Sequence, residues 1–139
     1  MSERTDYHLL RKKLLLPGDR IDRIENLVVS GMPDINFCAQ GIECWIEQKT
    51  AIEPKRFDTS LLTYKINQDQ KNWFLRQMRS RGRAFFLITT DKRWVLMSGS
   101  FADFINDMSV IEILHNCAWS TSKPIQSEQW TYLREALIS

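Results

Sequence analysis

Two acidic residues and a lysine stand close together in one part of the chain: Asp34, Glu47 and Lys49. Carboxylate oxygens are the ligands that hard divalent cations such as Mg²⁺ prefer, and a lysine beside such an ion can stabilise negative charge that develops during a reaction. These residue types suit a metal-dependent catalytic site, provided that the fold brings them together. A solvated surface with scattered charges is the alternative explanation.

The sequence around the two acids predicts a β-hairpin. Residues 34–39 and residues 42–49 both alternate polar and apolar side chains, and alternation with a period of two is the pattern of a β-strand. Gln40 and Gly41 stand between the two runs and suit a two-residue turn, because glycine accepts the positive φ that such turns require. We therefore expect two antiparallel strands joined by a tight turn.

The register of this hairpin follows from the turn. If Ala39 pairs with Ile42, the numbers of every facing pair add up to 81, and Asp34 faces Glu47. Opposed side chains on one face have Cβ atoms about 4.5–5.5 Å apart, so the two carboxylates would repel each other unless a cation lay between them. Lys49 follows Glu47 on the same face. The hairpin would therefore bring all three groups to one point.

The order of the motifs resembles the active-site signature of the PD-(D/E)xK nuclease superfamily, in which Pro-Asp is followed, after a spacer of about a dozen residues here, by Glu-x-Lys. The VRR-NUC group is the more similar part of that superfamily, and many of its members are small stand-alone phage or bacterial proteins. They carry Gly-x-Pro-Asp, a hairpin, Glu-x-Lys and a Gln-x-x-Trp helix that ends near a glycine. The matching segments here are Gly31-Met32-Pro33-Asp34, Glu47-Gln48-Lys49, Gln70-Lys71-Asn72-Trp73 and Gly82. The resemblance covers roughly residues 23–90, about half of the chain.

This resemblance implies a metal-dependent DNA endonuclease that selects junctions or branched DNA and uses Mg²⁺ or Mn²⁺. Asp34, Glu47 and the backbone carbonyl of Gln48 would hold the metal, and the side chain of Gln70 would approach it. Lys49 would position or activate the attacking water, or balance charge in the transition state. Nearby carboxylates raise the pKa of an amine rather than lower it, so we favour the electrostatic role for Lys49.

Members of the superfamily usually bring a further acidic residue ahead of the Pro-Asp pair. Glu25 is the favoured candidate, because it stands nine residues before Asp34 in a segment that reads as a neighbouring strand. Glu3, in the predicted first helix, is the alternative, since some relatives place this acid on an N-terminal helix. The carboxylate would add a ligand or orient the attacking water.

Basic residues gather in one segment although the net charge is only +2. Residues 71–83 contain five basic residues and no acidic residue. Such a segment can hold the phosphate backbone of DNA regardless of base sequence, through contacts that weaken as salt rises. The residues that we expect to contact DNA are Lys71, Arg76, Arg79 and Arg83, with Lys55 and Arg56 from the preceding loop.

Two other functions compete with a DNA endonuclease. A protein of the same fold could bind nucleic acid, or take part in an assembly, without cutting it. An RNA-processing nuclease of the same fold is the third candidate. A homodimer is expected if the protein cuts two strands of a junction symmetrically.

The remaining sequence predicts the elements that would position these residues. The continuous apolar run 84–90 is typical of a strand buried on both faces. Asn67 suits the N-cap of a helix that carries Gln70. Further elements are expected as helices over 5–16, 68–81, 101–106, 110–117 and 128–138, strands over 20–29 and 93–97, a loop over 50–66 and a linker over 120–127. Together with the resemblance, they predict an α/β fold with a central mixed β-sheet of four to five strands flanked by helices, a restriction-endonuclease-like core.

Length and composition suit a single globular domain. Hydrophobic residues make up 43% of the 139 residues and charged residues 26%, which is ordinary for such a domain. We expect one domain over residues 1–139, with a core at about 20–97 and a C-terminal helical extension at about 101–139. No apolar run approaches the roughly 20 residues that a membrane helix needs, and the N-terminus lacks the pattern of a secretory signal.

The cysteines and histidines predict neither a disulfide framework nor a zinc site. Cys38 and Cys44 point to opposite faces of the predicted hairpin, and the third cysteine, Cys117, stands far away in the sequence. The two histidines are also far apart, and there is no Cys-x-x-Cys motif. This pattern favours a reducing cytoplasm, which would be the cytoplasm of the host if the protein is viral.

Overall fold

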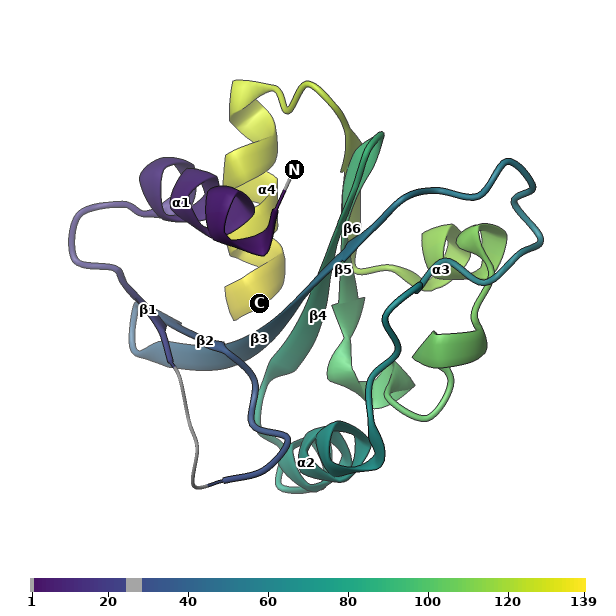
Figure 1. Ribbon diagram of the computed structural model, residues 1–139. Coiled ribbons are helices and arrows are strands. Elements are labelled where there is room, and N and C mark those ends of the chain that lie inside the picture. Colours follow the sequence, from purple (N-terminus) through teal and green to yellow (C-terminus); the bar gives the residue numbers. More distant parts are fainter. Residues whose placement is uncertain (1, 25–28) are drawn as a thin grey trace.

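A computed structural model describes residues 2–24 and 29–139, which form one mixed β-sheet with helices on both faces (Figure 1). The six strands lie side by side in chain order. All neighbouring pairs are antiparallel except β3 and β4, which are parallel. The strands are β1 (Arg20–Arg23), β2 (Ile35–Ala39), β3 (Ile42–Ala51), β4 (Ala84–Thr90), β5 (Arg93–Ser98) and β6 (Trp119–Ser122).

The helices cover the two faces of the sheet in pairs. α1 (Glu3–Leu14) and α4 (Ser127–Ile138) pack on one face, and α2 (Gln68–Arg79) and α3 (Val110–Asn116) lie on the other (Figure 1). Two short 3₁₀ helices, Gly99–Phe101 and Ile105–Asp107, connect β5 to α3. The predicted α/β fold with a mixed sheet between helices is therefore confirmed.

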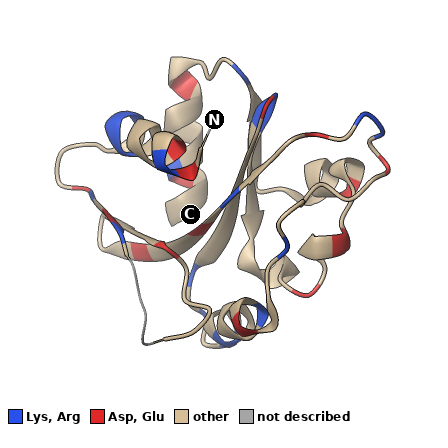
Figure 2. Cartoon of the chain, viewed as in Figure 1, with Lys and Arg blue, Asp and Glu red and all other residues tan. Residues whose placement is uncertain are grey.

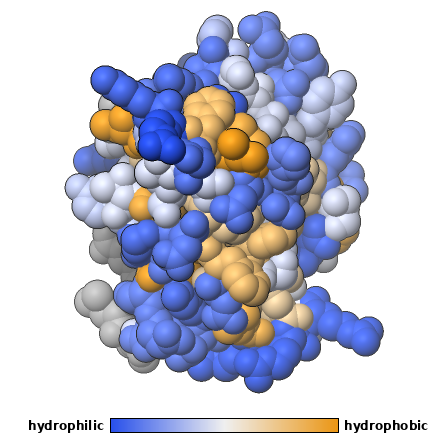
Figure 3. Space-filling model, turned by 90° about the vertical axis from the view of Figure 1, so that its right-hand side faces the viewer, coloured by the Kyte–Doolittle hydropathy of each residue, from blue (hydrophilic) through white to orange (hydrophobic). Residues whose placement is uncertain are grey.

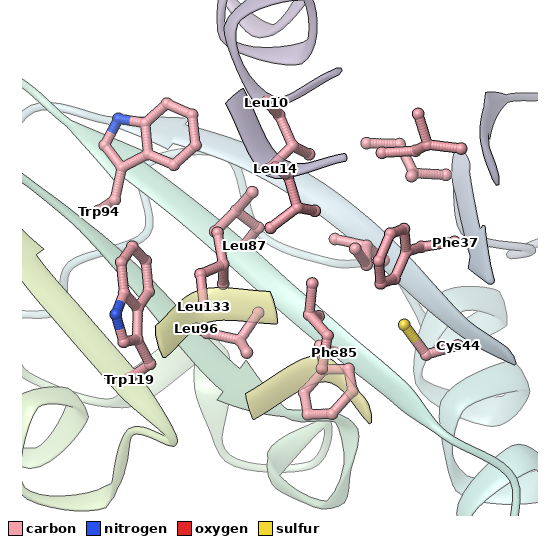
Figure 4. Packing of buried hydrophobic residues seen from close by; sticks show 14 of the residues in the cluster. Leu10, Leu14, Phe37, Cys44, Phe85, Leu87, Trp94, Leu96, Trp119 and Leu133 are labelled. Carbon is pink, nitrogen blue, oxygen red and sulfur yellow. The ribbon is translucent and has the colours of Figure 1, made fainter. Parts of the chain in front are cut away.

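Each face of the sheet has its own hydrophobic core. On the face of α1 and α4, Leu10 and Leu14 of α1 meet Leu133 of α4 above Phe37 and Leu87 of the sheet (Figure 4). On the other face, Phe74 of α2 stacks on Phe86 of β4 with ring centroids 4.1 Å apart. Strand β4 contributes to both cores and is buried along its whole length, as its continuous apolar sequence predicts.

The hairpin has the register that the sequence predicts. Ala39 pairs with Ile42 and Ile35 pairs with Ile46, so the residue numbers of every facing pair add up to 81. The turn residues Gln40 and Gly41 have φ angles of 55° and 76°, which is the arrangement of a two-residue turn that follows the twist of the strands.

The C-terminal part differs from the expectation in three respects. Residues 119–122 form β6, so that the sheet has six strands instead of the expected four to five, and this strand occupies the start of the predicted linker over 120–127. This strand is too short and polar to show alternation, and only its first residue, Trp119, is buried. The two 3₁₀ helices replace the helix expected over 101–106. Helix α4 begins at Ser127, one residue before the expected start at 128, and its N-cap is Gln126, whose side chain makes no capping hydrogen bond.

All three cysteines are free thiols. No helix among the described residues is both long and apolar enough to span a membrane. On the side of the molecule that carries α3, several large apolar side chains remain exposed (Figure 3), among them Phe57, Phe104 and Ile111.

Candidate active site

The two acids lie on the sheet face that α2 covers. Side chains alternate along β3, so that Trp45, Glu47 and Lys49 point to the same face. Trp45 contacts Trp73 of α2 with ring centroids 5.9 Å apart, which identifies this face as that of α2. Figure 2 shows both acidic and basic residues along β3.

Asp34 directly precedes β2 and is held against the middle of β3. The last ladder pair of the hairpin is Ile35 with Ile46, so the next pair in register is Asp34 with Glu47. The backbone N–H of Gln48 donates a hydrogen bond of 3.2 Å to Oδ1 of Asp34. The continued register thus places Asp34 next to Glu47, as the turn geometry predicts, and the charge of Asp34 acts on the carboxyl group of Glu47.

Glu47 receives two further groups that the sequence singled out. The ammonium Nζ of Lys49 lies 3.8 Å from Oε2 of Glu47, and their side chains are only 13% and 11% exposed. Nε2 of Gln70 donates a hydrogen bond of 3.1 Å to the same oxygen. Gln70 can reach it because its other side-chain atom, Oε1, accepts the N–H of Asn67 in the capping box of α2. The start of α2 thus fixes one oxygen of Glu47.

The electrostatics of Asp34 and Glu47 favour the binding of an additional positive charge beside the two carboxyl groups. Burial, and after it the negative charge of Asp34, raise the pKa of Glu47 to about 8, against the effect of Lys49. Burial also raises the pKa of Asp34, while the hydrogen bond from Gln48 and the charge of Arg23 lower it. The positive charge of Lys49 alone therefore does not balance the negative charge that two ionised, buried carboxyl groups would carry.

The donor groups fit a hard divalent cation. Asp34 and Glu47 supply carboxylate oxygens side by side, and the backbone carbonyl of Gln48 is the further oxygen that the resemblance implies. Within residues 2–24 and 29–139, no cluster of three or more His, Cys, Asp or Glu residues could hold a metal ion. A cation at this site would therefore depend on two acids, with water or substrate oxygens completing its coordination.

The two candidates for a further acid have different outcomes. Glu25 lies outside the described residues. Glu3 begins α1, and its backbone oxygen accepts a hydrogen bond of 3.2 Å from Nε2 of Gln48. Its negative charge raises the pKa of both Asp34 and Glu47. The structure therefore brings the alternative candidate, Glu3, near the carboxylate pair.

The loop before Asp34 is fitted closely to α2. Gly31 has a φ of +81°, and a Cβ atom added to it would lie 2.2 Å from the backbone oxygen of Asp69. Ser30 donates a hydrogen bond of 2.5 Å to the carboxylate of the same aspartate. This contact joins the segment that carries Asp34 to the helical turn that carries Gln70. In the sequence, Gly31 stands out only as part of a motif, and the packing reason for a glycine there becomes visible in the structure.

The predicted DNA-binding residues are spread over three places. Lys71, Arg76 and Arg79 lie on α2, the helix that contributes Gln70. Arg83 instead faces α4: its Nε donates a hydrogen bond of 3.0 Å to the backbone oxygen of Leu137. Its guanidinium also lies over Phe85, whose side chain belongs to the core on the α1 and α4 face. The expectation that Arg83 joins the others is therefore not met, because alternation along β4 turns that end toward the opposite face.

The loop with Lys55 and Arg56 also extends away from α2 (Figure 2). Its neighbour Phe57 accepts a backbone hydrogen bond from Ile111 of α3. Arg56 is exposed and pairs with Asp58 at 2.7 Å. The structure thus places these two basic residues on the α3 side and does not bring them to the carboxylate pair.

Comparisons with known proteins bear on the fold. No protein-family model matches the chain, and no curated protein matches its sequence. Among solved structures, the chain is similar to Hjc, a Holliday junction resolvase from the archaeal hyperthermophile Archaeoglobus fulgidus. The TM-score is 0.54 with 16% sequence identity, and the match covers 81% of this chain and 89% of that chain. The fold is similar to a resolvase fold. At this level of identity the likeness concerns the fold alone, and it supports the fold that the PD-(D/E)xK resemblance implied.

The raised pKa of Glu47 predicts how stability depends on pH. Between about pH 5 and pH 8 the folded metal-free protein keeps the Glu47 proton, while the unfolded chain has lost it. The free energy of unfolding should therefore fall as pH rises through this range, by up to about 1.4 kcal/mol per pH unit, the limit for one proton. Urea denaturation between pH 5 and pH 9 measures this slope.

The Glu47→Gln variant is the control for this prediction, because it removes the titrating group and keeps the shape. Its slope should be flatter than that of the wild type by the contribution of Glu47. Added Mg²⁺ should stabilise the wild type more at pH 8 than at pH 5, because the ion binds the deprotonated carboxylate. Equal slopes in the two proteins would show that Glu47 ionises normally.

Proposed function

We propose that this protein is a metal-dependent DNA endonuclease that selects junctions or other branched DNA. The observation that carries the proposal is the group around Glu47: Asp34 opposite it, Lys49 at 3.8 Å and Gln70 at 3.1 Å from one of its oxygens. The motif order in the sequence and the similarity to a resolvase fold support it. Three segments of the motif, which are separated in the sequence, contribute these four residues.

The residues have separate roles in hydrolysis. Asp34 and Glu47, with the backbone carbonyl of Gln48, would hold Mg²⁺ or Mn²⁺. A divalent metal, when bound, supplies positive charge to the phosphoryl oxygens and lowers the pKa of the attacking water. Gln70 fixes one oxygen of Glu47 and so limits the rotation of that carboxylate. Lys49 supplies a second positive charge to the phosphoryl group, where negative charge increases in the transition state.

The DNA backbone would approach along α2. Lys71, Arg76 and Arg79 are the basic residues of the helix that also reaches Glu47. These contacts are independent of base sequence and weaken with salt. Selectivity for branched DNA would then come from the shape of the substrate, and cutting both strands of a junction symmetrically would require a homodimer. The exposed apolar side chains near α3, Phe57, Phe104 and Ile111, are the surface that such a dimer would bury.

The test is a cleavage assay on several substrates. Supercoiled plasmid, linear duplex, a four-way junction and a matched RNA are each incubated with the wild type and with Glu47→Gln, in Mg²⁺, in Mn²⁺ and in EDTA. We expect the wild type alone to cut, only with metal, and to cut the junction faster than the linear duplex. Absence of any cutting by the wild type contradicts the proposal, and preferred cutting of RNA contradicts the DNA substrate.

A non-catalytic nucleic-acid-binding protein is the second candidate. The observation that favours it is that the described residues provide two close carboxylates and no cluster of three metal-binding side chains. In that case the wild type and Glu47→Gln would retain DNA equally and neither would cut it. The same assay, followed by gel retardation, separates the two functions.

A further inference from the structure

Two large apolar side chains beside the candidate site are almost fully exposed. Tyr64 is 73% exposed and Ile52 is 71% exposed, more than any other large hydrophobic residue among those described. Together with Thr50, Ala51 and Thr63 they line a hollow of about 260 Å³. An apolar residue that is exposed singly needs no explanation, but two that line one hollow next to a polar site indicate a binding surface.

The hollow adjoins the carboxylate site along β3. Ala51 stands two residues after Lys49 and therefore points to the same face, about 7 Å further along the strand. Its side chain packs with Leu61, Leu62 and Ile66, which shows that the segment before α2 runs over this face. Thr50, Ala51 and Ile52 of the hollow thus directly continue the strand segment that carries Glu47 and Lys49, and Thr63 and Tyr64 come from the segment before α2.

This part of β3 has an open edge. Strand β2 begins at Ile35, opposite Ile46, and the side chain of Asp34 accepts the N–H of Gln48, so that among the described residues no strand pairs with residues 49–51 of β3 on this side. The opposite edge is closed, because Ala51 pairs with Thr90 of β4. Thr50 and Ala51 point to different faces of the sheet and both line the hollow. The hollow therefore lies at the open edge, where a substrate can approach the carboxylates from solvent.

The lining indicates what the hollow could hold. Its walls combine one aromatic ring, a branched aliphatic side chain and the hydroxyl groups of Thr50 and Thr63. Its volume is below the range of about 300–1,000 Å³ that is typical of sites for drug-sized ligands, so it suits a single flat ring. A nucleobase offers both an apolar face for stacking and polar edges for hydrogen bonds. Lys49 adds the positive charge that a nucleotide attached to that base requires.

We propose that Tyr64 and Ile52 hold one unpaired base of a DNA substrate, next to the phosphate that Asp34, Glu47 and Lys49 contact. The inference rests on the proposed function and deepens it, because it defines the substrate class. A base within a continuous duplex is stacked on its neighbours and cannot enter the hollow without being unstacked, which costs energy. The site would therefore favour DNA with unpaired bases beside the cut, such as a flap, a bulge or a frayed branch point.

Binding tests this inference without relying on cleavage. Oligonucleotides carry the fluorescent base 2-aminopurine, either in an unpaired position at a branch or within a linear duplex, and no divalent metal is added. Stacking on Tyr64 should quench the unpaired probe. Tyr64→Ala should remove this quenching and weaken binding of the branched DNA about tenfold, which is within the range for one stacked base, and should leave duplex binding unchanged.

Two further variants complete the test. Tyr64→Phe keeps the ring and should behave as the wild type. Tyr132→Ala removes a tyrosine of α4 that is 51% exposed on the opposite face of the sheet, and should have no effect. Circular dichroism spectra check that each variant is folded.

The outcomes separate this inference from the proposed function. Cleavage by the wild type together with equal binding and quenching in Tyr64→Ala overturns the stacking role and leaves the nuclease. Quenching that depends on Tyr64 in a wild type that cuts no substrate supports the stacking role and contradicts the nuclease. If Tyr64→Ala weakens binding of linear duplex as much as it weakens binding of branched DNA, the inference is also overturned, because the hollow would then not select unpaired bases.

Discussion

Lys49→Ala should lower the rate of metal-dependent DNA cleavage by about 10²–10³-fold, the range found when one preorganised group that stabilises transition-state charge is removed. The side chain of Lys49 is only 13% exposed and its ammonium lies 3.8 Å from Oε2 of Glu47. A charge held in such a place acts more strongly than a surface charge, because little water screens it. Single-turnover cleavage of a labelled four-way junction at saturating metal measures the rate.

Controls separate loss of chemistry from loss of DNA binding. Lys12→Ala removes an exposed lysine of α1 and should leave the rate unchanged. Lys49→Ala should bind the junction within about twofold of the wild type, because one phosphate contact among several contributes little to affinity. A Lys49→Ala protein that is folded, binds DNA and cuts at the wild-type rate would remove Lys49 from the mechanism.

Lys49→Arg distinguishes the two roles that the sequence left open for this residue. Arginine keeps the positive charge but does not lose its proton at any ordinary pH. If Lys49 stabilises charge, Lys49→Arg should be more active than Lys49→Ala. If Lys49 removes a proton from the attacking water, both variants should be equally inactive. The geometry of the site favours the first result, because the ammonium of Lys49 lies 3.8 Å from Oε2 of Glu47 and is placed to act as a fixed charge.

The part of the site that depends on local geometry was predictable from the sequence. Alternation fixed the faces of the two strands, and the turn at Gln40 and Gly41 fixed the register. Asp34 and Glu47 had to face each other once these two features were known. The cap of α2 was predictable as well, because Asn67 and Gln70 have the types and spacing of a capping box.

The part of the site that depends on packing between distant segments was not predictable in the same way. Arg83 belongs to the same basic segment as Arg79, but a change from helix to strand turns it toward α4. Glu3 reaches the site only because α1 packs across the sheet at that point. The short strand β6 lacks enough residues to show alternation, and its pairing with β5 supplies the order that its own sequence does not. These are tertiary effects that override local patterns.

The close contact between the loop before Asp34 and α2 is a further tertiary effect. The Gly-x-Pro-Asp segment and the Gln-x-x-Trp helix are far apart in the sequence, and the structure joins them at Gly31 and Asp69. Their alignment decides whether Gln70 can reach Glu47 while Asp34 faces it. Glycine is therefore required at position 31 for two reasons: it accepts a positive φ, and it has no side chain that would collide with α2.

Gly31→Ala should accordingly destabilise the fold by about 2–5 kcal/mol and reduce cleavage. The left-handed backbone alone costs an L-residue roughly 1–2 kcal/mol. The added Cβ would also lie 2.2 Å from the backbone oxygen of Asp69, so the loop or the helix must move, and overpacking of this kind costs about 1–3 kcal/mol more. Equilibrium urea denaturation measures the stability, and the junction assay measures cleavage.

Gly41→Ala is the matched control for this prediction. Gly41 has a nearly equal φ of +76°, but no atom lies within 4 Å of its added Cβ. It should therefore lose only the backbone contribution, about 1–2 kcal/mol, and should cleave DNA as the wild type does under conditions in which it is folded. The difference between the two variants isolates the contact with α2. Equal losses of stability would show that the loop before Asp34 does not press on the helix, and the positioning of Gln70 would then need another cause.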